Sequence, residues 1–468
     1  MNYVNLNKIK FFYFLGIGGI GMSSLARYFN SIGKIVHGYD KNKTHITKDL
    51  ENEGIIINYY DNIKFIPHWI NSEKCLIVYT IAIPNNNNQW NFIKKNGKNI
   101  KKRSQVLAMI TKNNISIAIG GAHGKTTTCT LLGHILYNSG VKITAFLGGI
   151  SRNYRSNFIS SGKDFFLTEA DEFNHSFLYL SPNIVCITSI DQDHIDTYSN
   201  KIKLENAYMS FLKKIKNPYK KIFLCKEDSF LPKCKNAIYY SLIEKKEYYT
   251  DNIITKNNVW YFDFHTPKDV WKSMVLLMPG FHNIKNATAA LSIADYLNIS
   301  QDKIRKSLLL FKGIERRYTI HYQSNNNNKL FIDDYAHHPT EIDNLIITVR
   351  KCFHRKKILG IFQPHLFSRT KYFEYYFAKV LEKLDFLILL EIYPARESKK
   401  NYDNISSHTL IKKIKMKSKN KEIASISNVI EIINKKQFNF DIILTIGAGN
   451  IDTLIIPIKK WLYEKYGK

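Results

Sequence analysis

Short apolar runs alternate with amphipathic stretches along most of the chain. In the first hundred residues, apolar runs at 11–15, 34–40 and 74–80 alternate with helical stretches such as 23–33. Such an alternation of strand-like and helical segments is typical of a parallel sheet with helices on its faces. The pattern therefore predicts an α/β fold.

The same rhythm returns in two later blocks. Strand-like runs at 115–121, 164–171 and 183–191 and helices near 203–215 and 286–297 form the second block, and runs at 329–338, 356–365, 386–395 and 441–450 form the third. We expect three domains, at residues 1–103, 104–314 and 315–468, with the basic stretch from Lys94 to Ser104 as a linker. Because ligands of open α/β sheets gather where strands end, the polar residues after each run are the candidates for chemistry.

Composition changes this picture little. The length of 468 residues suggests two to four domains, and 44% hydrophobic content is enough to give each a buried core. The chain has 68 Lys and Arg against 39 Asp and Glu, a net charge of +29, which raises the question of nucleic-acid binding. However, 57 of the basic residues are Lys, and they are spread along the chain together with Asn and Ile. Since phosphate and base recognition favours Arg, the charge indicates compositional drift, and we expect no nucleic-acid partner.

The sequence also predicts a cytoplasmic protein. Its six cysteines form no CxxC pair, so neither a zinc site nor a disulfide framework is expected. Lys8 and Lys10 precede an apolar stretch that superficially resembles a signal peptide, but glycines between 16 and 21 interrupt it. No other stretch is long and apolar enough to span a bilayer, so no membrane association is expected.

A first glycine-rich loop, Gly16-x-Gly18-Gly19-x-Gly21, separates a predicted strand from a predicted helix. Glycines at such a turn let the backbone approach a pyrophosphate at a helix N-terminus, where free N–H groups favour anions. Asp40 ends the next strand, near where an acidic residue would bond a ribose hydroxyl. The alternative is a tight turn that needs glycine for packing alone. The motif indicates a nucleotide-diphosphate site more securely than it indicates NAD.

A second loop also joins a strand to a helix, and it consists of Gly121, Ala122, His123, Gly124, Lys125, Thr126 and Thr127. Backbone N–H groups of such a loop cradle phosphates, Lys125 can offset charge on the β and γ phosphates, and the Thr126 hydroxyl can ligate Mg²⁺. The common form of the motif has a further glycine where Ile119 stands, so this is a shortened variant, which we interpret as an ATP site. Two phosphate loops in separate blocks imply two different phosphate-bearing ligands.

Candidate metal ligands lie at the ends of two predicted strands. Glu169 ends one strand and His194 follows the next. Since Mg²⁺ prefers carboxylate, hydroxyl and phosphate oxygens, Thr126 and Glu169 make a sensible pair, whereas the residue type of His194 favours a structural hydrogen bond. Further carboxylates could serve instead or be solvated: Asp171, Glu172, Asp191 and Asp193.

More polar motifs follow towards the C-terminus. Asn283 and Asn286 fall on one face of a helix start and could cap it or read an adenine edge. The order His337-His338-x-x-Glu341 differs from the HExxH zinc arrangement, which argues against a metalloprotease. Other polar residues also follow predicted strands: Arg316, Arg317, Asp333, Asp334, the segment from His365 to Arg369, and the segment from Gly447 to Asn450.

Together these motifs resemble those of one family, the Mur ligases of peptidoglycan synthesis. The resemblance runs from Gly16 to Gly449 and is carried by GIGGIGMS, GAHGKTTT, TEADE, DHID, GFHNIKNA, GIERRY, DDYAHHPTE, FQPH…SRT and GAG. It is greatest to the members that join L-alanine to UDP-N-acetylmuramate. It implies a Rossmann-like UDP-sugar domain, a central P-loop-type ATPase domain that binds ATP and Mg²⁺, and a Rossmann-like C-terminal domain that closes over the site. We expect a monomer or a weak homodimer.

The resemblance also implies roles for single residues in this numbering. Lys125 would stabilise the transferring phosphate while Thr126, Glu169 and His194 hold Mg²⁺, which reverses the interpretation of His194. The remaining implied roles are adenosine contacts for Asn283 and Asn286, ATP contacts for Arg317 and Asp334, positions near the reacting ends for His337 and His338, and substrate binding for Gly16, Gly18, Gly19, Gly21, Asp40, His365 and Arg369. We favour one of the two histidines as the base that deprotonates the amine.

The sequence departs from the family pattern in two places. Leu366 and Phe367 stand where the family often has Arg-Tyr after His365, so Arg369 is left to grip the amino acid. Ala122 replaces a frequent threonine in the phosphate loop.

Three rival functions remain open. One is the related ligase that attaches a recycled tripeptide to UDP-N-acetylmuramate, against which GIGGIGMS argues. The second is a basic, nucleic-acid-binding ATPase, for which no RNP-like, zinc-finger or helix-turn-helix motif is present. The third is a degraded relative without catalysis, against which the presence of Lys125, Glu169 and Arg317 argues.

Overall fold

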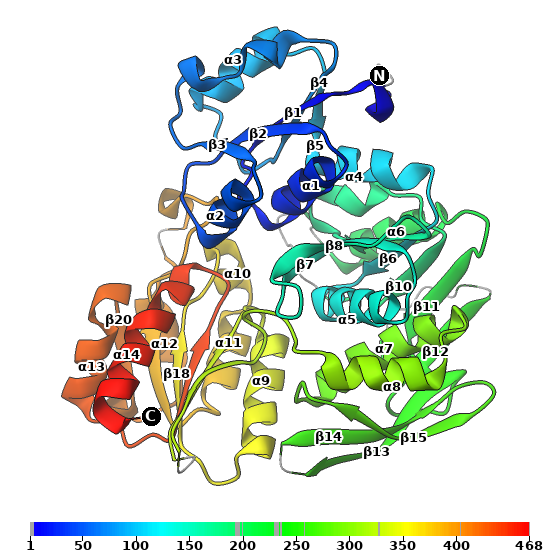
Figure 1. Cartoon of the computed structure of the whole chain (residues 1–468). Coiled ribbons are helices and arrows are strands. Elements are labelled where there is room, and N and C mark those ends of the chain that lie inside the picture. The colour runs from blue at the N-terminus through cyan, green and yellow to red at the C-terminus, as the bar shows by residue number, and fades with distance from the viewer. Residues whose placement is uncertain are drawn as a thin grey trace.

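The chain folds into three domains, each built on its own sheet (Figure 1). The structure is a computed structural model that describes residues 4–191, 197–198, 200–228, 234, 236–256, 258–325, 328–402 and 404–467. In Figure 1 the blue N-terminal domain lies at the top, the green central domain below it, and the yellow-to-red C-terminal domain beside the central one. The predicted three-domain α/β architecture is confirmed.

The N-terminal domain has a five-stranded, wholly parallel sheet in the order β3-β2-β1-β4-β5. The apolar run at 11–15 forms the central strand of this sheet. An interior strand is buried on both faces, which explains why the run is continuously apolar. The strands are β1 (Phe11–Leu15), β2 (Ile35–Tyr39), β3 (Ile56–Asn58), β4 (Cys75–Tyr79) and β5 (Ile100–Lys102). The helices are η1 (Leu6–Lys8), α1 (Ile20–Ser31), α2 (His45–Asn52), η2 (Ile63–Phe65), η3 (His68–Asn71), α3 (Asn88–Asn96) and α4 (Arg103–Lys112).

The linker predicted at 94–104 is wrong. Three of its residues form β5, which pairs in parallel with β4, and Arg103 then begins α4. Val106 and Ile110 of α4 belong to one apolar cluster that includes residues of both the first and the central domain. The segment is therefore a packed connection between two domains.

The central domain has a ten-stranded sheet in the order β15-β14-β13-β12-β11-β10-β6-β9-β7-β8. The three predicted strands are β6, β9 and β10, which are neighbours in the middle of the sheet and run in parallel, so their polar ends meet. The strands are β6 (Ser116–Gly120), β7 (Ile143–Ser151), β8 (Ser156–Ser160), β9 (Phe165–Ala170), β10 (Ile184–Ile187), β11 (Lys221–Cys225), β12 (Ala237–Ser241), β13 (Tyr248–Lys256), β14 (Val259–His265) and β15 (Val270–Leu276). The helices are α5 (Lys125–Asn138), η4 (Phe173–Tyr179), α6 (Lys201–Leu212), α7 (Phe281–Tyr296) and α8 (Gln301–Leu310).

A buried polar contact fixes the first domain on the second. Arg27 of α1 is 4% exposed, and its guanidinium donates to Glu53 at 2.8 Å and to the side-chain oxygen of Asn157 in β8. The amide nitrogen of Asn157 in turn donates to the Ser23 hydroxyl at 2.9 Å. Since buried polar groups are costly without partners, this network specifies how α1 sits on the central sheet.

The C-terminal domain has a six-stranded sheet in the order β16-β17-β21-β18-β19-β20, parallel except for β16. The four predicted strands are β17, β18, β19 and β21, and all are confirmed. The strands are β16 (Thr319–Gln323), β17 (Leu330–Asp334), β18 (Ile358–Phe362), β19 (Phe386–Leu390), β20 (Lys421–Ala424) and β21 (Ile442–Ile446). The helices are α9 (Pro339–Cys352), α10 (Phe367–Tyr372), α11 (Glu374–Leu381), η5 (Lys399–Asn401), α12 (Ser407–Lys413), η6 (Ser418–Asn420), η7 (Ile426–Asn428), α13 (Val429–Lys436), η8 (Asn450–Leu454) and α14 (Ile455–Tyr466).

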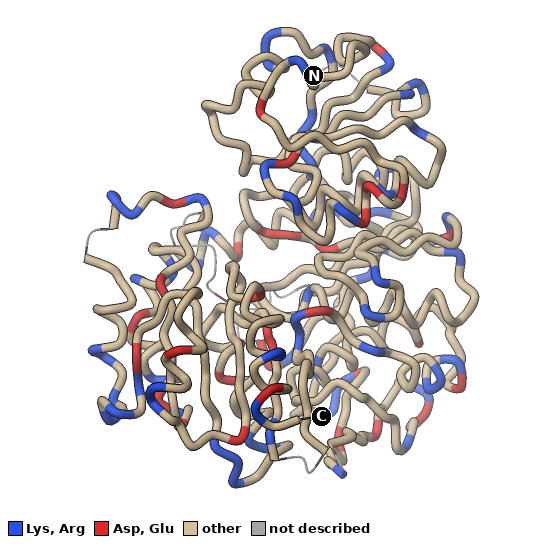
Figure 2. Tube along the Cα trace, turned by 60° about the vertical axis from the view of Figure 1, so that its left-hand side comes forward, with Lys and Arg blue, Asp and Glu red and all other residues tan. Residues whose placement is uncertain are grey.

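The basic residues are distributed over all three domains, with acidic residues scattered among them (Figure 2). Figure 2 thus shows dispersed charge, with no continuous stripe of Lys and Arg in the view. Within the described residues, no helix combines the length and apolar character that crossing a bilayer requires.

Candidate functional site

The second glycine loop connects β6 to α5 and is braced by the segment that follows β10. Gly121 has φ of 125°, and a Cβ there would lie 2.7 Å from the Ser189 nitrogen. Ala122 N–H donates to the Ser189 carbonyl at 2.8 Å, and His123 N–H donates to the Ser189 hydroxyl at 2.9 Å. Gly124, the N-cap of α5, has φ of 84°, and no side chain in the described part of the chain caps this helix. The open N-terminus suits a phosphate.

The side chain of Lys125, the first residue of α5, is fixed beside this loop by hydrogen bonds. Its ammonium donates to both carboxylate oxygens of Glu172, at 3.0 and 3.1 Å, and to the carbonyl of Gly121 at 2.5 Å. Burial favours the neutral amine, but the negative charges of Glu172 and Asp171 outweigh it and raise the pKa of Lys125. The residue is therefore a fixed positive charge beside the loop.

Glu169 and Thr126 lie together beside Lys125. One oxygen of Glu169 accepts the Gly148 N–H at 2.7 Å, and burial raises the pKa of this carboxyl although Lys125 and a hydrogen bond from Thr126 partly offset the effect. A half-buried carboxylate next to a hydroxyl is a donor set that fits Mg²⁺. The third predicted ligand, His194, lies outside the described residues.

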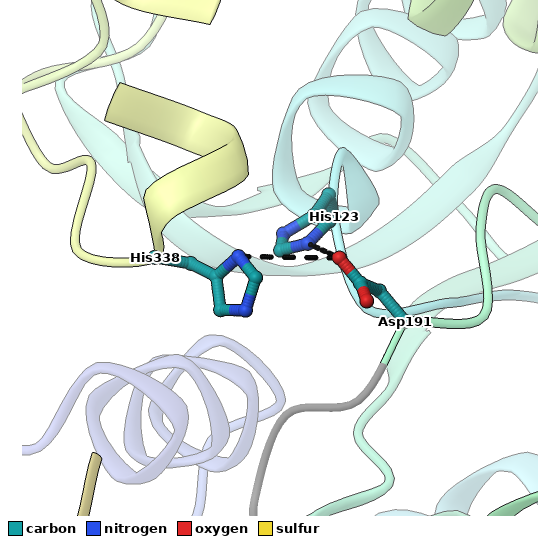
Figure 3. A group of neighbouring side chains, drawn as sticks. All are labelled: His123, Asp191 and His338. Carbon is teal, nitrogen blue, oxygen red and sulfur yellow. Dashed lines mark hydrogen bonds and ion pairs between the residues drawn. The ribbon is translucent and has the colours of Figure 1, made fainter. Parts of the chain in front are cut away.

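His123, Asp191 and His338 form a close group at the junction of the central and C-terminal domains (Figure 3). His123 Nε2 lies 3.0 Å and His338 Nδ1 3.9 Å from the same oxygen of Asp191. His123 Nδ1 also lies 3.3 Å from Glu341, and although burial favours the neutral ring, the two carboxylates raise the pKa of His123 to about 9. The two carboxylates thus favour the protonated His123 ring, which pairs with Asp191 of the central domain and with Glu341 of the C-terminal domain.

A cavity of about 700 Å³ lies beside the phosphate loop, between the central and C-terminal domains. Its lining includes most of the predicted ATP residues: His123, Gly124, Thr126, Thr127, Asn283, Asn286, Arg317 and Asp334. Asn283 donates to the Pro279 carbonyl at 2.6 Å, and α7 has Gly280 as its N-cap without a side-chain cap. The capping alternative for the two asparagines is therefore wrong.

A second cavity of about 420 Å³ is lined by all three domains. Gly19 and Gly21 come from the first domain, Lys125 and Glu169 from the second, and the third contributes a set of polar residues. That set is Arg317, Tyr335, His337 and Glu341. The two phosphate loops thus open into one space.

The first glycine loop has the strand-to-helix geometry predicted for it. Gly16 has φ of 83°, and a Cβ there would lie 2.6 Å from Thr80. One carboxylate oxygen of Asp40 accepts the Gly18 N–H at 2.8 Å, so in this structure Asp40 braces the loop. Helix α1 begins after Gly19 without a side-chain cap.

Two neighbouring arginines of the C-terminal domain point to different partners. Arg316 donates to Asp333 at 3.2 Å and to the Gly447 carbonyl at 2.6 Å, so it holds the loop after β21. Arg317 lines both cavities. Asp334 accepts backbone N–H groups at 2.8 Å, and burial, partly offset by Arg317, raises its pKa to about 6.

The two histidines before α9 also differ. His338 is the N-cap of α9, and its Nδ1 accepts the Thr340 N–H at 3.3 Å. His337 lines the second cavity, and its Nδ1 donates to the Tyr335 carbonyl at 3.0 Å. This hydrogen bond favours the tautomer whose lone pair is on Nε2.

His365 and Arg369 line neither cavity, although the rings of His365 and His337 are 6.2 Å apart. Arg369 is 5% exposed, and its guanidinium lies 3.4 Å from His365 Nδ1. Leu366 and Phe367 are both buried, so the residues at the departure from the family pattern pack inward.

Comparisons with known proteins agree along the whole chain. Residues 11–114 match the Mur ligase family, catalytic domain, residues 119–294 the Mur ligase middle domain, and residues 316–449 the Mur ligase, glutamate ligase domain. The UDP-N-acetylmuramate--L-alanine ligase of Flavobacterium psychrophilum is 42% identical over 462 residues, which cover 99% of this chain and 100% of that protein. The chain belongs to the Mur ligase family.

Two solved structures support this membership of the Mur ligase family at the level of the fold. The UDP-N-acetylmuramate-alanine ligase of Thermotoga maritima superposes with a TM-score of 0.81 at 26% identity, covering 97% of this chain and 98% of that one. A murein peptide ligase of Psychrobacter arcticus superposes with a TM-score of 0.71 at 21% identity, covering 98% and 99%.

Three residues of the site have contacts that the motifs of this Mur ligase did not indicate. Glu172 accepts hydrogen bonds from Lys125, and Glu341 contacts His123. The motifs contain both acidic residues but do not indicate these partners. Arg103 lies in the segment that was predicted to be a linker. Its guanidinium lies next to Gly21 in the second cavity, 3.6 Å from Asp171. The sequence signal that could have indicated Arg103 as a site residue is its position at the start of a helix that follows a parallel strand.

Proposed function

We propose that this Mur ligase joins L-alanine to the lactoyl carboxylate of UDP-N-acetylmuramate, with cleavage of ATP to ADP and phosphate. The observation that carries the proposal is the second cavity, where Gly19 and Gly21 of one phosphate loop face Lys125 of the other. Relatives that span the whole chain bear the name of this activity. We further propose that the protein acts in the cytoplasm as a monomer or weak homodimer.

The proposal assigns one ligand to each phosphate loop. Residues 1–103 would hold the UDP-sugar, with its pyrophosphate at the open start of α1 and Arg103 nearby as a further cation. Residues 104–314 would hold ATP, with its phosphates on the loop before α5 and its adenosine against Asn283 and Asn286. Residues 315–468 would close over both ligands.

The first chemical step turns the carboxylate into an acylating agent. The lactoyl carboxylate oxygen attacks the γ-phosphorus of ATP, the bond from that phosphorus to the β,γ-bridging oxygen breaks, and ADP leaves. Lys125 neutralises charge on the transferring phosphoryl group, and Arg317 adds a second positive charge from the C-terminal domain. Closure of the three domains excludes water, which protects the acyl phosphate from hydrolysis.

The second step forms the amide. The uncharged amine of L-alanine attacks the acyl-phosphate carbonyl, and the tetrahedral intermediate expels phosphate. His337 is the better placed of the two histidines to take the amine proton, because it lines the second cavity while His338 caps α9. Arg369 would grip the amino-acid carboxylate beside His365.

Mg²⁺ would be held by Thr126 and Glu169, with His194 as a third ligand, and would neutralise charge on the ATP phosphates. The half-buried Glu169 carboxylate beside Thr126 supports this assignment.

The test measures ADP release and product mass. Purified protein with ATP, Mg²⁺, UDP-N-acetylmuramate and L-alanine should release ADP and yield a product heavier than the UDP-sugar by one alanyl residue, and Lys125→Ala should abolish both. Release only when the tripeptide replaces L-alanine, or release that DNA or RNA stimulates without any UDP-sugar, would reject the proposal.

A further inference from the structure

Glu341 joins groups from two domains through one buried carboxylate. It is the third residue of α9, and its side chain is 15% exposed. Oε1 lies 3.3 Å from Nδ1 of His123 in the phosphate loop and 4.0 Å from Arg317. Oε2 accepts the backbone N–H of His337 at 3.1 Å and lies 3.4 Å from His337 Nδ1. The carboxylate therefore contacts the phosphate loop, the ATP-facing arginine and the candidate base at once.

His123 belongs to the phosphate loop, so it connects Glu341 to that loop. Its second ring nitrogen pairs with Asp191 at 3.0 Å (Figure 3). Its backbone N–H donates to the Ser189 hydroxyl. His123 stands two positions before Lys125, so a shift of its ring changes the loop that presents the lysine. The Thr340 hydroxyl, 3.3 Å from Asp191, adds a second link from α9 to the same cluster.

Two simpler explanations of Glu341 fall short. An acidic residue in the first turn favours a helix by its charge and by accepting a preceding N–H, as Glu341 does from His337. That local role needs no partner 218 positions away, yet His123 is one. A metal-ligand role has no geometric support, because the group of described side chains spaced to hold an ion consists of His123, Asp191 and His338 and leaves Glu341 out.

We propose that Glu341 is a positioning residue that docks the C-terminal domain on the phosphate loop through His123. While α9 is docked, Glu341 fixes the positions of Arg317 and His337 relative to Lys125. The groups that act in both chemical steps are then aligned together. The kinetic arm of the test rests on the proposed function; the exchange arm does not.

The kinetic arm compares Glu341→Gln with Asp343→Asn, a matched carboxylate-to-amide change on the same helix at an exposed pair with Lys383. We expect Glu341→Gln to lower kcat at least about tenfold while the affinity for a non-hydrolysable ATP analogue changes less than about threefold. His123→Gln should behave alike, and the double variant should fall no more than about twofold below the lower single variant. Asp343→Asn should stay within about twofold of wild type.

Three kinetic outcomes would overturn the inference. They are an unchanged kcat in Glu341→Gln, losses that multiply in the double variant, and a loss confined to nucleotide affinity, which would make Glu341 a brace of the loop alone.

The exchange arm uses hydrogen–deuterium exchange of the full chain without ligands. Glu341→Gln should speed exchange of the amides at 121–125, which lie in the other domain, whereas Asp343→Asn should not. Wild-type exchange at 121–125 in Glu341→Gln would overturn the inference whatever the substrates are. Inactivity of the wild-type protein with UDP-N-acetylmuramate and L-alanine would instead refute the proposed function.

Discussion

Substitution of Gly148 by alanine should displace the proposed Mg²⁺ ligand Glu169 without straining the backbone. Gly148 is not among the glycines with positive φ, so alanine fits its main chain. The added Cβ, however, would lie 2.5 Å from Glu169 Oε2 and 2.6 Å from its Cδ, where ordinary contact begins at 3.4 Å. The carboxylate must therefore retreat by about 1 Å.

A displacement of this size is large for metal-assisted phosphoryl transfer. Mg²⁺ demands near-ideal octahedral geometry, and a misplacement of about 1 Å costs on the order of 100-fold in rate, or ~3 kcal/mol of transition-state stabilisation. We expect kcat/KM for ATP to fall by about this factor and half-saturation to need more Mg²⁺. The measurement is ADP formation by chromatography, with free Mg²⁺ varied at saturating UDP-N-acetylmuramate and L-alanine.

The matched control is Gly133→Ala in α5 of the same domain. Its Cβ would make an ordinary contact of 3.4 Å with Leu167, and alanine favours a helix, so activity should be unchanged and the midpoint of thermal unfolding slightly higher. Wild-type kcat/KM and Mg²⁺ dependence in folded Gly148→Ala would refute the assignment of Glu169 to the metal.

Three further predictions concern other contacts. Gly124→Ala should weaken ATP binding at least about tenfold in a calorimetric titration, because φ of 84° strains alanine and its Cβ would lie 3.0 Å from Asn286 Cγ; wild-type affinity would contradict this. Arg27→Met should lower the free energy of unfolding of the N-terminal domain by about 2 kcal/mol in guanidinium, because Asn157 loses its charged partner, and an unchanged midpoint would speak against that contact. Burial lowers the pKa of His134 to about 4 from 6.5, so the unfolded chain binds the proton first as pH falls. Stability is therefore full above pH 6.5 and loses about 3 kcal/mol towards pH 4, and His134→Gln should flatten this dependence in unfolding curves measured across that range.

Interior strands were predictable because burial on both faces leaves a continuous apolar run. All five residues of β6, β18 and β21 are buried, and the run of β6 leads directly into the glycine loop of the site. The glycine loops were predictable for a related reason, since Gly121 and Gly124 occupy backbone conformations that other residues rarely adopt. Sequence alone thus located the sheet centres and both glycine-rich strand-to-helix loops.

Edge strands were predictable less well. β5 has three partly exposed residues, two of them lysines, so its sequence is typical of a linker. Only the pairing with β4 makes it a strand. The antiparallel part of the central sheet was also hard to predict, although β13 and β14 lie inside the sheet. β14 pairs antiparallel with β13 and β15, and both β13 and β14 alternate buried and more exposed positions, a weak period-two signal within polar surroundings. In both cases tertiary pairing decides a structure that local sequence leaves open.

The site itself shows a sharper limit. Motif spacing supplied Lys125 and Glu169 because each lies at the end of its own strand, and strand order alone brings them together. The pairing of His123 with Glu341 depends instead on how α9 docks across a domain boundary, and no local pattern encodes that approach. In the sequence, the order His337-His338-x-x-Glu341 argues against an HExxH zinc site and indicates no partner for Glu341. In the structure, Glu341 lies 3.3 Å from His123 Nδ1, and the segment forms an interdomain contact. The chemistry of a residue could be inferred from its type and motif, but its partner could be inferred only after the domains were placed.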